Sequence, residues 1–286
     1  MPHPIRTIAV TGANSRTGRQ LLPRLAGPGV RVVALVRTAQ DLPADEVVED
    51  WTNAPRAVEV LREASAVVHL SGVFAASDWD SYRDGTVATT RRVVEAMNPA
   101  ARLVCLSYVE ADPAGDNWYI KSKGQAEELV STVADSVIFR IDALAGGRDD
   151  PAPFELMYRQ AAPGVPVRVI GDGTQRFRPV YSADAVEALV KAAGGDGRPG
   201  TYDLVGPGEF LAADLPGLIN GRPVPVEYVS AGQATAVSKV PHTLADLLAN
   251  HAVPPGSEAV AHAFGLSLTC LETTWPIGTS GDAPAR

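Results

Sequence analysis

Three polar side chains near the middle of the chain could together deliver a proton to a carbonyl oxygen. Tyr119 and Lys123 are four residues apart, a spacing that stacks both side chains on one face of a helix. An ammonium group beside a phenol is expected to lower the phenol pKa from its usual value of about 10, which eases proton transfer at neutral pH. Ser107, at the end of a predicted strand, can donate a hydrogen bond to the same oxygen. The pattern favours carbonyl reduction beside a hydride donor, and an ordinary surface pair on a helix is the alternative.

A second chemical signal is a glycine-containing turn after the first predicted strand, where residues 11–18 read TGANSRTG. Glycine serves such a turn where φ is positive or where the backbone must approach a pyrophosphate, and the helix that follows offers free N–H groups. Ser15 stands where a third glycine is expected. We predict a dinucleotide-binding turn, with a merely tight strand-to-helix turn as the alternative. Its residues are Gly12, Asn14, Ser15, Arg16, Thr17 and Gly18.

The residue that follows the second predicted strand bears on the choice of cofactor. An acid at this place would bind the 2′-hydroxyl of NAD, whereas a base accommodates the 2′-phosphate of NADP. Arg37 follows the strand at 31–36. Together with Arg16 it predicts NADPH (NADP+) as the cofactor, with NADH possible, and a solvated arginine at a strand end is the alternative.

The elements that must position these residues alternate between short β-branched runs and longer helical patterns. This rhythm is typical of βαβ units and predicts an α/β fold with a Rossmann-type doubly wound parallel sheet. The predicted strands cover 7–10, 31–36, 66–70, 102–106 and 136–140, and the predicted helices cover 18–26, 54–64, 80–97 and 119–133.

The second half of the chain changes character, because Pro and Gly interrupt it often after about residue 145. Strand-like segments at 165–170, 201–205 and 224–229 suggest a smaller C-terminal substrate lobe. We assign residues 1–150 to a dinucleotide-binding Rossmann domain and residues 151–286 mainly to the substrate-binding lobe. Segments at about 178–205 are expected to return to the Rossmann core.

Composition excludes several classes of function. The formal net charge is -8, so no basic field is available for nucleic acid. The N-terminus lacks a signal-peptide pattern and no apolar run reaches the length of a membrane span, which predicts no membrane partner and a cytoplasmic location. Cys105, Cys270 and the five histidines show no metal-ligand spacing, so no metal is expected. A monomer or homodimer is expected.

Beside these motifs, the chain from about residue 5 to 210 resembles the short-chain dehydrogenase/reductase superfamily, in the extended or atypical branch that holds the NAD-dependent epimerases/dehydratases and the NmrA-like reductases. TGANSRTG is similar to that branch's TGxxGxxG. The most specific likeness is LeuSer at 106–107 followed by Tyr119 and Lys123. The resemblance implies that Lys123 also binds the nicotinamide ribose.

The same resemblance implies further cofactor contacts. Asp50 looks like the aspartate that contacts adenine, and Leu70, Ser71 and Gly72 look like the segment that lines the cofactor ribose. Arg140 and Ile141 resemble a strand that ends in ArgProGly in the family, whose following loop closes over the nicotinamide. Here Ile141 and Asp142 replace the Pro and Gly. Tyr108 stands where relatives often carry a second Ser or Thr.

Aromatic and other large side chains are expected at the substrate site, although each could equally belong to the core. They favour a flat, apolar ketone, such as a polycyclic one, over a charged sugar nucleotide. These residues are Phe74, Trp79, Tyr108, Trp118, Met157 and Phe177.

The motifs together predict an NADPH-dependent ketoreductase that acts on a small organic ketone of the secondary-metabolite (antibiotic or polyketide) type. Tyr119, Lys123 and Ser107, or else a substrate hydroxyl, would handle the proton. One alternative is a sugar-nucleotide epimerase or dehydratase, a class that usually has an acid after the second strand. The other is a non-catalytic NADP(H)-sensing regulator of the NmrA-like type, although such members lack the Tyr-Lys pair.

Overall fold

The structure is a computed structural model of the chain that describes residues 6–252 and 256–277. The chain forms two compact units. Unit 1 holds the described residues up to 140 together with 186–202 and 259–266, and unit 2 holds the described residues of 141–185, 203–258 and 267 onward. Residues 186–202 lie within the range predicted to return to the first half of the chain, whereas the return of 259–266 is not predicted by the sequence. Each unit is described by itself.

A seven-stranded sheet forms the centre of unit 1 within the described residues, with the order β11-β6-β5-β4-β1-β2-β3. The pairs β1–β2, β1–β4, β2–β3 and β4–β5 are parallel. The order of the first six strands is that of a dinucleotide-binding Rossmann sheet, which confirms the predicted fold class. The strands are β1 (Arg6–Thr11), β2 (Val30–Leu35), β3 (Glu46–Val48), β4 (Ala66–His69), β5 (Arg102–Tyr108), β6 (Ser136–Ile141) and β11 (Gly200–Asp203).

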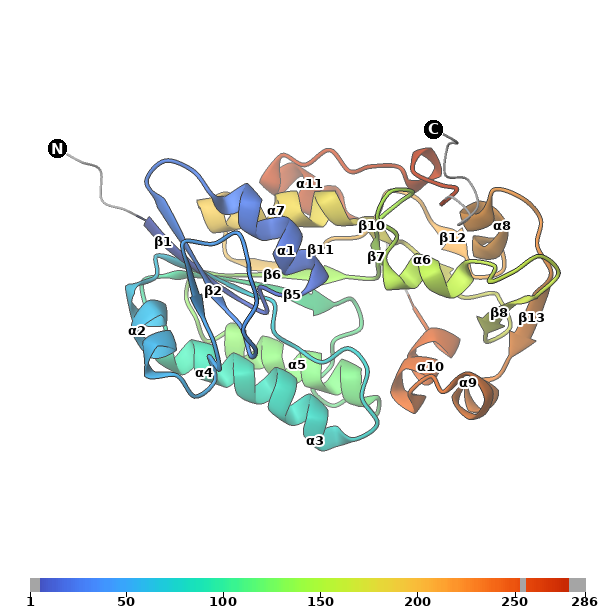
Figure 1. Cartoon of the computed structure of the whole chain (residues 1–286), viewed down its shortest axis with the longest axis horizontal. Coiled ribbons are helices and arrows are strands. Elements are labelled where there is room, and N and C mark those ends of the chain that lie inside the picture. The colour runs from blue at the N-terminus through green and yellow to red at the C-terminus, as the bar shows by residue number, and fades with distance from the viewer. Residues whose placement is uncertain (1–5, 253–255, 278–286) are drawn as a thin grey trace. The chain divides into compact units, whose positions relative to one another are not determined.

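Helices cover both faces of this sheet, which explains why the central strands are continuous apolar runs. Figure 1 shows α1 and α7 on one face and α2, α4 and α5 on the other. The helices are α1 (Arg16–Leu25), α2 (Pro55–Glu63), α3 (Trp79–Tyr82), α4 (Thr89–Ala96), α5 (Trp118–Val130), α7 (Ser182–Gly194) and α11 (Glu258–Phe264). A π-helical segment, η1 (Arg83–Ala88), joins α3 to α4.

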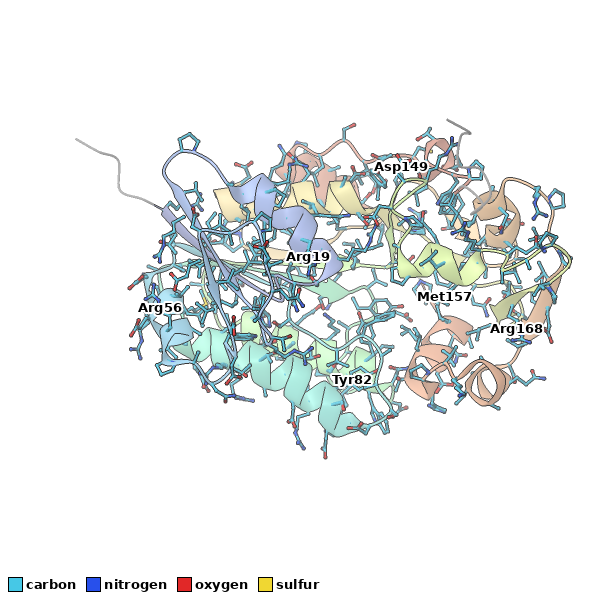
Figure 2. The ribbon with its side chains drawn as sticks, viewed as in Figure 1. Arg19, Arg56, Tyr82, Asp149, Met157 and Arg168 are labelled. Carbon is cyan, nitrogen blue, oxygen red and sulfur yellow. The ribbon has the colours of Figure 1, made fainter. Side chains whose placement is uncertain are left out.

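Local sequence signals account for where these helices begin. Ser15 caps α1 by accepting the Gly18 N–H, and Asn117 caps α5 by accepting the Tyr119 N–H at 3.0 Å; side-chain oxygens at this position satisfy N–H groups that have no partner within the helix. Pro55 opens α2, where its missing N–H does no harm. Arginines such as Arg19 on α1 and Arg56 on α2 lie on the outer faces of these helices, and the apolar faces pack on the sheet (Figure 2).

The described residues of unit 2 form three two-stranded sheets and short helices around an apolar core that contains Phe154, Phe177, Phe210 and Trp275. The predicted strands at 165–170 and 224–229 form β8 (Val167–Ile170) and β13 (Val226–Val229), which pair in parallel. The other strands are β7 (Leu144–Ala145), β9 (Arg176–Phe177), β10 (Val180–Tyr181) and β12 (Phe210–Leu211). The helices are α6 (Pro153–Tyr158), α8 (Leu215–Asn220), α9 (Ala231–Ser238), α10 (His242–Ala249) and η2 (Leu271–Thr273).

None of the helices in the described residues is both long and apolar enough to cross a membrane.

Candidate active site

The turn after β1 has the geometry that its glycines predict. Gly12 has φ +62, and a Cβ there would lie 2.8 Å from the carbonyl carbon of Leu70. A Cβ at Gly18 would lie 2.5 Å from the carbonyl oxygen of Ala13, so glycine is required for α1 to pack against the turn. Ser15 has φ -66, a conformation open to any residue, and its Oγ accepts the Gly18 N–H at 3.0 Å. The middle glycine of the motif is therefore replaced by a helix cap.

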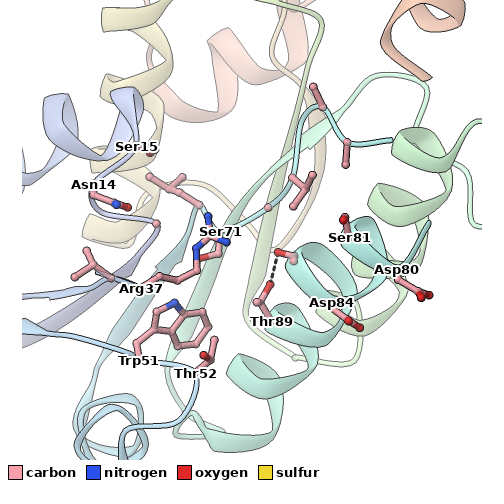
Figure 3. A pocket seen from close by; sticks show the side chains of 18 of the residues that line it. Asn14, Ser15, Arg37, Trp51, Thr52, Ser71, Asp80, Ser81, Asp84 and Thr89 are labelled. Atoms are coloured by element: carbon pink, nitrogen blue, oxygen red, sulfur yellow. Dashed lines mark hydrogen bonds between the residues drawn. The ribbon is translucent and has the colours of Figure 1, made fainter. Parts of the chain in front are cut away.

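A cavity of about 880 Å³ opens beside this turn, at the carboxyl ends of β1, β2 and β4. The edge where parallel strands end is where nucleotides bind in folds of this kind. Figure 3 shows Arg37, just after β2, extending into the cavity, with Trp51 and Thr52 on one wall. The segment after β4, α3, the start of η1 and Thr89 at the start of α4 also line it. The lining residues that the sequence predicted for the cofactor are Gly12, Asn14, Ser15, Arg37, Leu70, Ser71 and Gly72.

Several predicted cofactor residues do not line the larger cavity. Arg16, Thr17 and Gly18 form the first turn of α1, behind the lining residues. Asp50 is exposed and its carboxylate accepts a hydrogen bond from Asn53 at 2.9 Å, while its neighbours Trp51 and Thr52 line the cavity. The cofactor roles of these residues stay predictions.

The end of β6 presents the same situation. The guanidinium of Arg140 forms an ion pair with Glu127 of α5 at 2.6 Å. Ile141 is half-buried, and neither residue lines the cavities described. Their contact with a cofactor also stays a prediction.

A second, much smaller cavity of about 20 Å³ brings Ser107 and Lys123 together. Ser71 lines both cavities. Lys123 is half-buried and its ammonium donates to the carbonyl oxygen of Leu106 at 3.2 Å, and desolvation of the ammonium lowers the Lys123 pKa. The Ser107 hydroxyl is buried without a hydrogen-bond partner among the described residues. Because buried hydroxyls are rarely left unpaired, this one is suited to receive a ligand oxygen.

Tyr119 lies in an aromatic cluster rather than in the lining of either cavity. Its ring makes edge contacts with Phe74, Tyr82 and Tyr108, at centroid distances of 5.4, 6.4 and 5.2 Å. The Lys123 ammonium is 5.8 Å from the ring centroid. Burial, with a smaller contribution from Tyr82, raises the Tyr119 pKa above its usual value. The expectation of a lowered pKa is therefore wrong for this structure, because desolvation by burial disfavours the phenolate and Tyr82 adds to the effect.

The residues predicted to contact substrate are found in both units. In unit 1, Phe74 is 52% exposed and Trp118 is 37% exposed, and the Lys121 ammonium lies 5.5 Å from the centroid of the Trp79 ring. In unit 2, Met157 lies on α6 and packs against the apolar core (Figure 2). Phe177 is buried in that core and stacks on His251. Phe177 thus has a packing role, and a substrate contact for it stays a prediction.

Some residues that line the cavities are not among those predicted from the sequence. Trp51 and Thr52 directly follow the predicted Asp50, and sequence alone does not decide which of three neighbours points inward. Thr86 and Thr90 lie on the face of η1 and α4 that packs on the sheet, where their spacing of four residues is a usable signal. His69, Cys105 and Glu127 also line the smaller cavity, and Leu106 belongs to its apolar part.

Comparison with known proteins agrees with this architecture. The model of the NAD dependent epimerase/dehydratase family matches residues 8–204. The chain therefore belongs to this family, which confirms the resemblance predicted from the turn and from the Tyr119–Lys123 segment.

Two curated relatives match more distantly. A ceramide reductase of Caulobacter vibrioides is 29% identical over 192 residues, which are 64% of this chain and 59% of that protein. The Arabidopsis thaliana protein named NADH dehydrogenase (ubiquinone) 1 alpha subcomplex subunit 9, mitochondrial, is 26% identical over 223 residues, 72% of this chain and 55% of that protein. The chain thus spans little more than half the length of these relatives.

Solved structures show the same fold. The UDP-glucuronic acid 4-epimerase of Bacillus cereus in complex with NAD is 18% identical, with a TM-score of 0.70 over 94% of this chain and 95% of that one. WbmH of Bordetella bronchiseptica in complex with NAD+ is 20% identical, with a TM-score of 0.73 and the same coverage. At these identities the likeness concerns the fold.

Proposed function

We propose that this chain is an NADPH-dependent reductase that transfers hydride to the carbonyl carbon of a small, apolar ketone. The observation that carries the proposal is the pairing of the buried, unpartnered Ser107 hydroxyl with the Lys123 ammonium in one small cavity. Membership of the NAD-dependent epimerase/dehydratase family and the reductase among the relatives support an oxidoreductase-type enzyme.

The residues of the larger cavity suit the cofactor. Gly12 leaves room for a close approach to the turn, and a side chain at this position would instead meet the Leu70 backbone. Arg37 brings a guanidinium, which can bind a phosphate through two parallel N–H groups, to the end of β2. This supports NADPH over NADH. The structural neighbours are described with NAD, so the preference for NADPH is part of the proposal.

The cofactor supplies hydride when bound, and three side chains act on the substrate oxygen: Ser107 and Lys123, which line the smaller cavity, and Tyr119, whose ring lies 5.8 Å from the Lys123 ammonium. The Ser107 O–H donates a hydrogen bond to the carbonyl oxygen and polarises it. Tyr119 is the proton donor: its phenol is protonated at neutral pH, and because burial raises its pKa, the transfer depends on stabilisation of the phenolate. Lys123 stabilises the phenolate that remains after the transfer. A substrate hydroxyl that supplies the proton is the alternative to Tyr119.

The surroundings of Tyr119 favour an apolar substrate. Phe74 and Trp118 present exposed rings close to this end of α5, and Tyr108 packs against the Tyr119 ring. Exposed aromatic surface that converges on a reacting group is suited to a flat, apolar ligand. A polycyclic ketone of the secondary-metabolite (antibiotic or polyketide) type meets this description, and a long-chain lipid ketone is consistent with the ceramide reductase among the relatives.

A sugar-nucleotide epimerase or dehydratase is the second candidate, because the matching family model bears that description. Epimerases retain their nucleotide through the reaction, whereas a reductase exchanges it after each turnover. The nucleotide that is released when the purified protein is denatured therefore separates the two. Stoichiometric NAD would favour the epimerase and contradict the reductase.

The direct test is NADPH oxidation with a panel of apolar ketones. We expect Tyr119→Phe, Lys123→Met and Ser107→Ala each to lower kcat/KM by roughly 100-fold or more, the range for loss of acid catalysis or of a transition-state hydrogen bond. Lys191→Met on α7 removes a lysine on the opposite face of the sheet and is expected to leave the rate unchanged. Normal turnover by both Tyr119→Phe and Lys123→Met would contradict the proposed chemistry.

A further inference from the structure

A continuous chain of hydrogen bonds passes through His69 at the end of β4. The Ser71 N–H donates to Thr11 Oγ1 at 3.3 Å, and Thr11 Oγ1 lies 2.7 Å from His69 Nδ1. On the other side of the ring, Nε2 lies 3.0 Å from Thr90 Oγ1, and the Thr90 hydroxyl donates to the carbonyl oxygen of Thr86 at 2.7 Å. All three side chains are buried. These hydrogen bonds thus connect β1, the segment after β4, η1 and α4.

The carbonyl oxygen at the end of this series of hydrogen bonds fixes which group donates in each of them. A carbonyl oxygen can only accept, so the Thr90 hydroxyl donates to it and must itself accept from His69 Nε2–H. The neutral ring then accepts at Nδ1 from the Thr11 hydroxyl. That leaves Thr11 Oγ1 free to accept the Ser71 N–H. Burial lowers the His69 pKa to about 3, which keeps the ring neutral and this arrangement intact at physiological pH.

The segment held by this network is the wall that the two cavities share. Leu70, Ser71, Gly72 and Val73 line the larger cavity, and Ser71 also lines the smaller one. A second amide of this segment is also held by a threonine hydroxyl, because the Val73 N–H donates to Thr86 Oγ1 at 3.0 Å.

Close packing of η1 fixes the same wall from outside. A Cβ on Gly85 would lie 2.3 Å from Val73 Cγ2, so a larger residue here would force Val73 or η1 to shift. The π-helical turn brings Gly85 and Thr86 to the segment together, and such turns are frequent at functional sites.

We propose that His69 is a positioning residue for the cofactor: through Thr11 and Thr90 it holds residues 70–73 in the conformation that lets one dinucleotide occupy both cavities. The inference rests on the proposed function, because it requires a dinucleotide that passes from the Arg37 side to the Lys123 side. His69 itself does not touch the reacting atoms. A buried polar network in which every donor has an acceptor is rigid, and rigid support is what a preorganised site needs.

The test compares variants that break the network with variants that keep its hydroxyls. Thr11→Val and His69→Phe preserve most of the shape but each removes two hydrogen bonds of the network, and we expect each to raise the NADPH Kd about tenfold or more, at least the effect of one lost hydrogen bond. Thr11→Ser keeps the hydroxyl and is expected to stay within about twofold of wild type. Thr7→Val makes the same substitution at the opposite end of β1 and is the matched control.

Two readouts separate positioning from general destabilisation. NADPH fluorescence titration well below Tm gives the Kd, and hydrogen exchange at the Ser71 amide reports its order directly. The proposal expects faster Ser71 exchange and weaker NADPH binding in Thr11→Val, with both restored in Thr11→Ser. It is overturned if Thr11→Val keeps the wild-type Kd or if Thr7→Val weakens binding equally. Should His69→Phe fail to fold, the Thr11 pair still decides.

Failure of the proposed function gives a different result. If the wild-type protein binds neither NADPH nor NADH, the reductase proposal fails on that measurement alone. The exchange comparison between Thr11→Val and Thr11→Ser still shows whether the network orders residues 70–73, and unchanged exchange in Thr11→Val overturns the positioning role.

Discussion

Substitution of Glu155 in unit 2 gives the sharpest prediction, because hydrogen bonds to its one buried carboxylate hold a whole loop in place. Its side chain is fully buried and accepts four hydrogen bonds. Oε2 accepts the N–H groups of Gly146 and Ala152, each at 2.7 Å. Oε1 accepts the Gly147 N–H at 2.9 Å and the Trp275 indole N–H at 2.6 Å. The carboxylate thus ties the loop between β7 and α6 to the C-terminal part of the unit.

Glu155→Gln changes almost nothing in shape but makes one of the two oxygens a donor. Whichever way the amide turns, its NH₂ group faces two N–H donors, so two of the four hydrogen bonds are lost. A hydrogen bond to a charged group contributes about 1.5 to 3 kcal/mol. The substitution should therefore lower the free energy of unfolding of unit 2 by about 3 to 6 kcal/mol, a large part of the 5 to 15 kcal/mol typical of a domain.

Hydrogen exchange at the Gly146 and Gly147 amides is the primary measurement, because the two units need not unfold together and a single urea transition is ambiguous. Urea unfolding followed by Trp275 fluorescence supports it, since the other three tryptophans belong to unit 1. Glu209→Gln is the control; Glu209 is part-exposed in ion pairs with Arg176 and Arg178, where less than about 1 kcal/mol is expected. A loss below 1 kcal/mol in Glu155→Gln would refute the reasoning.

Three further predictions concern the nucleotide site. Arg37→Asp is expected to raise the NADPH Kd about tenfold and to improve NADH binding, because the exposed guanidinium binds a phosphate that NADH lacks; equal effects on both nucleotides in fluorescence titrations would contradict the role. Gly12→Ala should weaken the binding of both nucleotides more than tenfold and destabilise unit 1 by about 1 to 3 kcal/mol, since its Cβ would overlap the Leu70 backbone at positive φ. Gly27→Ala has open space around its Cβ and serves as the harmless control in titration and thermal unfolding. Finally, burial lowers the His69 pKa from 6.5 to about 3, so between these pH values the unfolded chain binds a proton that the folded chain does not. The free energy of unfolding should therefore fall by up to about 1.4 kcal/mol per pH unit as pH drops from 6.5 toward 3. Urea unfolding at pH 7, 6 and 5 should show a shallower fall in His69→Gln than in wild type, and parallel curves would disprove this.

The fold of unit 1 could be predicted because its signals are local. Runs such as Ala66–His69, buried along their whole length, alternate with amphipathic helices, and that order leaves few arrangements other than a doubly wound sheet. The first turn is similar, since only glycine at positions 12 and 18 allows the close contacts that the structure shows there.

Unit 2 was less predictable for the opposite reason. Its strands are short and pair across long stretches of chain, as β8 does with β13. Nothing within either segment selects the other as its partner, because the pairing depends on the core that both cover. Glu155 reads in sequence as an ordinary acidic residue near a helix start, and its four donors come from residues as distant as Trp275.

The candidate site likewise combines features that follow from local sequence with features that only the tertiary structure decides. Spacing in the sequence determined that Tyr119 and Lys123 share one face of α5 and that Gly12 begins the turn, because both facts depend only on neighbouring backbone. Tertiary structure alone decided that the Tyr119 pKa rises, that Trp51 rather than Asp50 lines the cavity, and that His69 links β1 to α4. Desolvation and hydrogen bonding depend on every group packed around a side chain, and segments far apart in the sequence supply those groups.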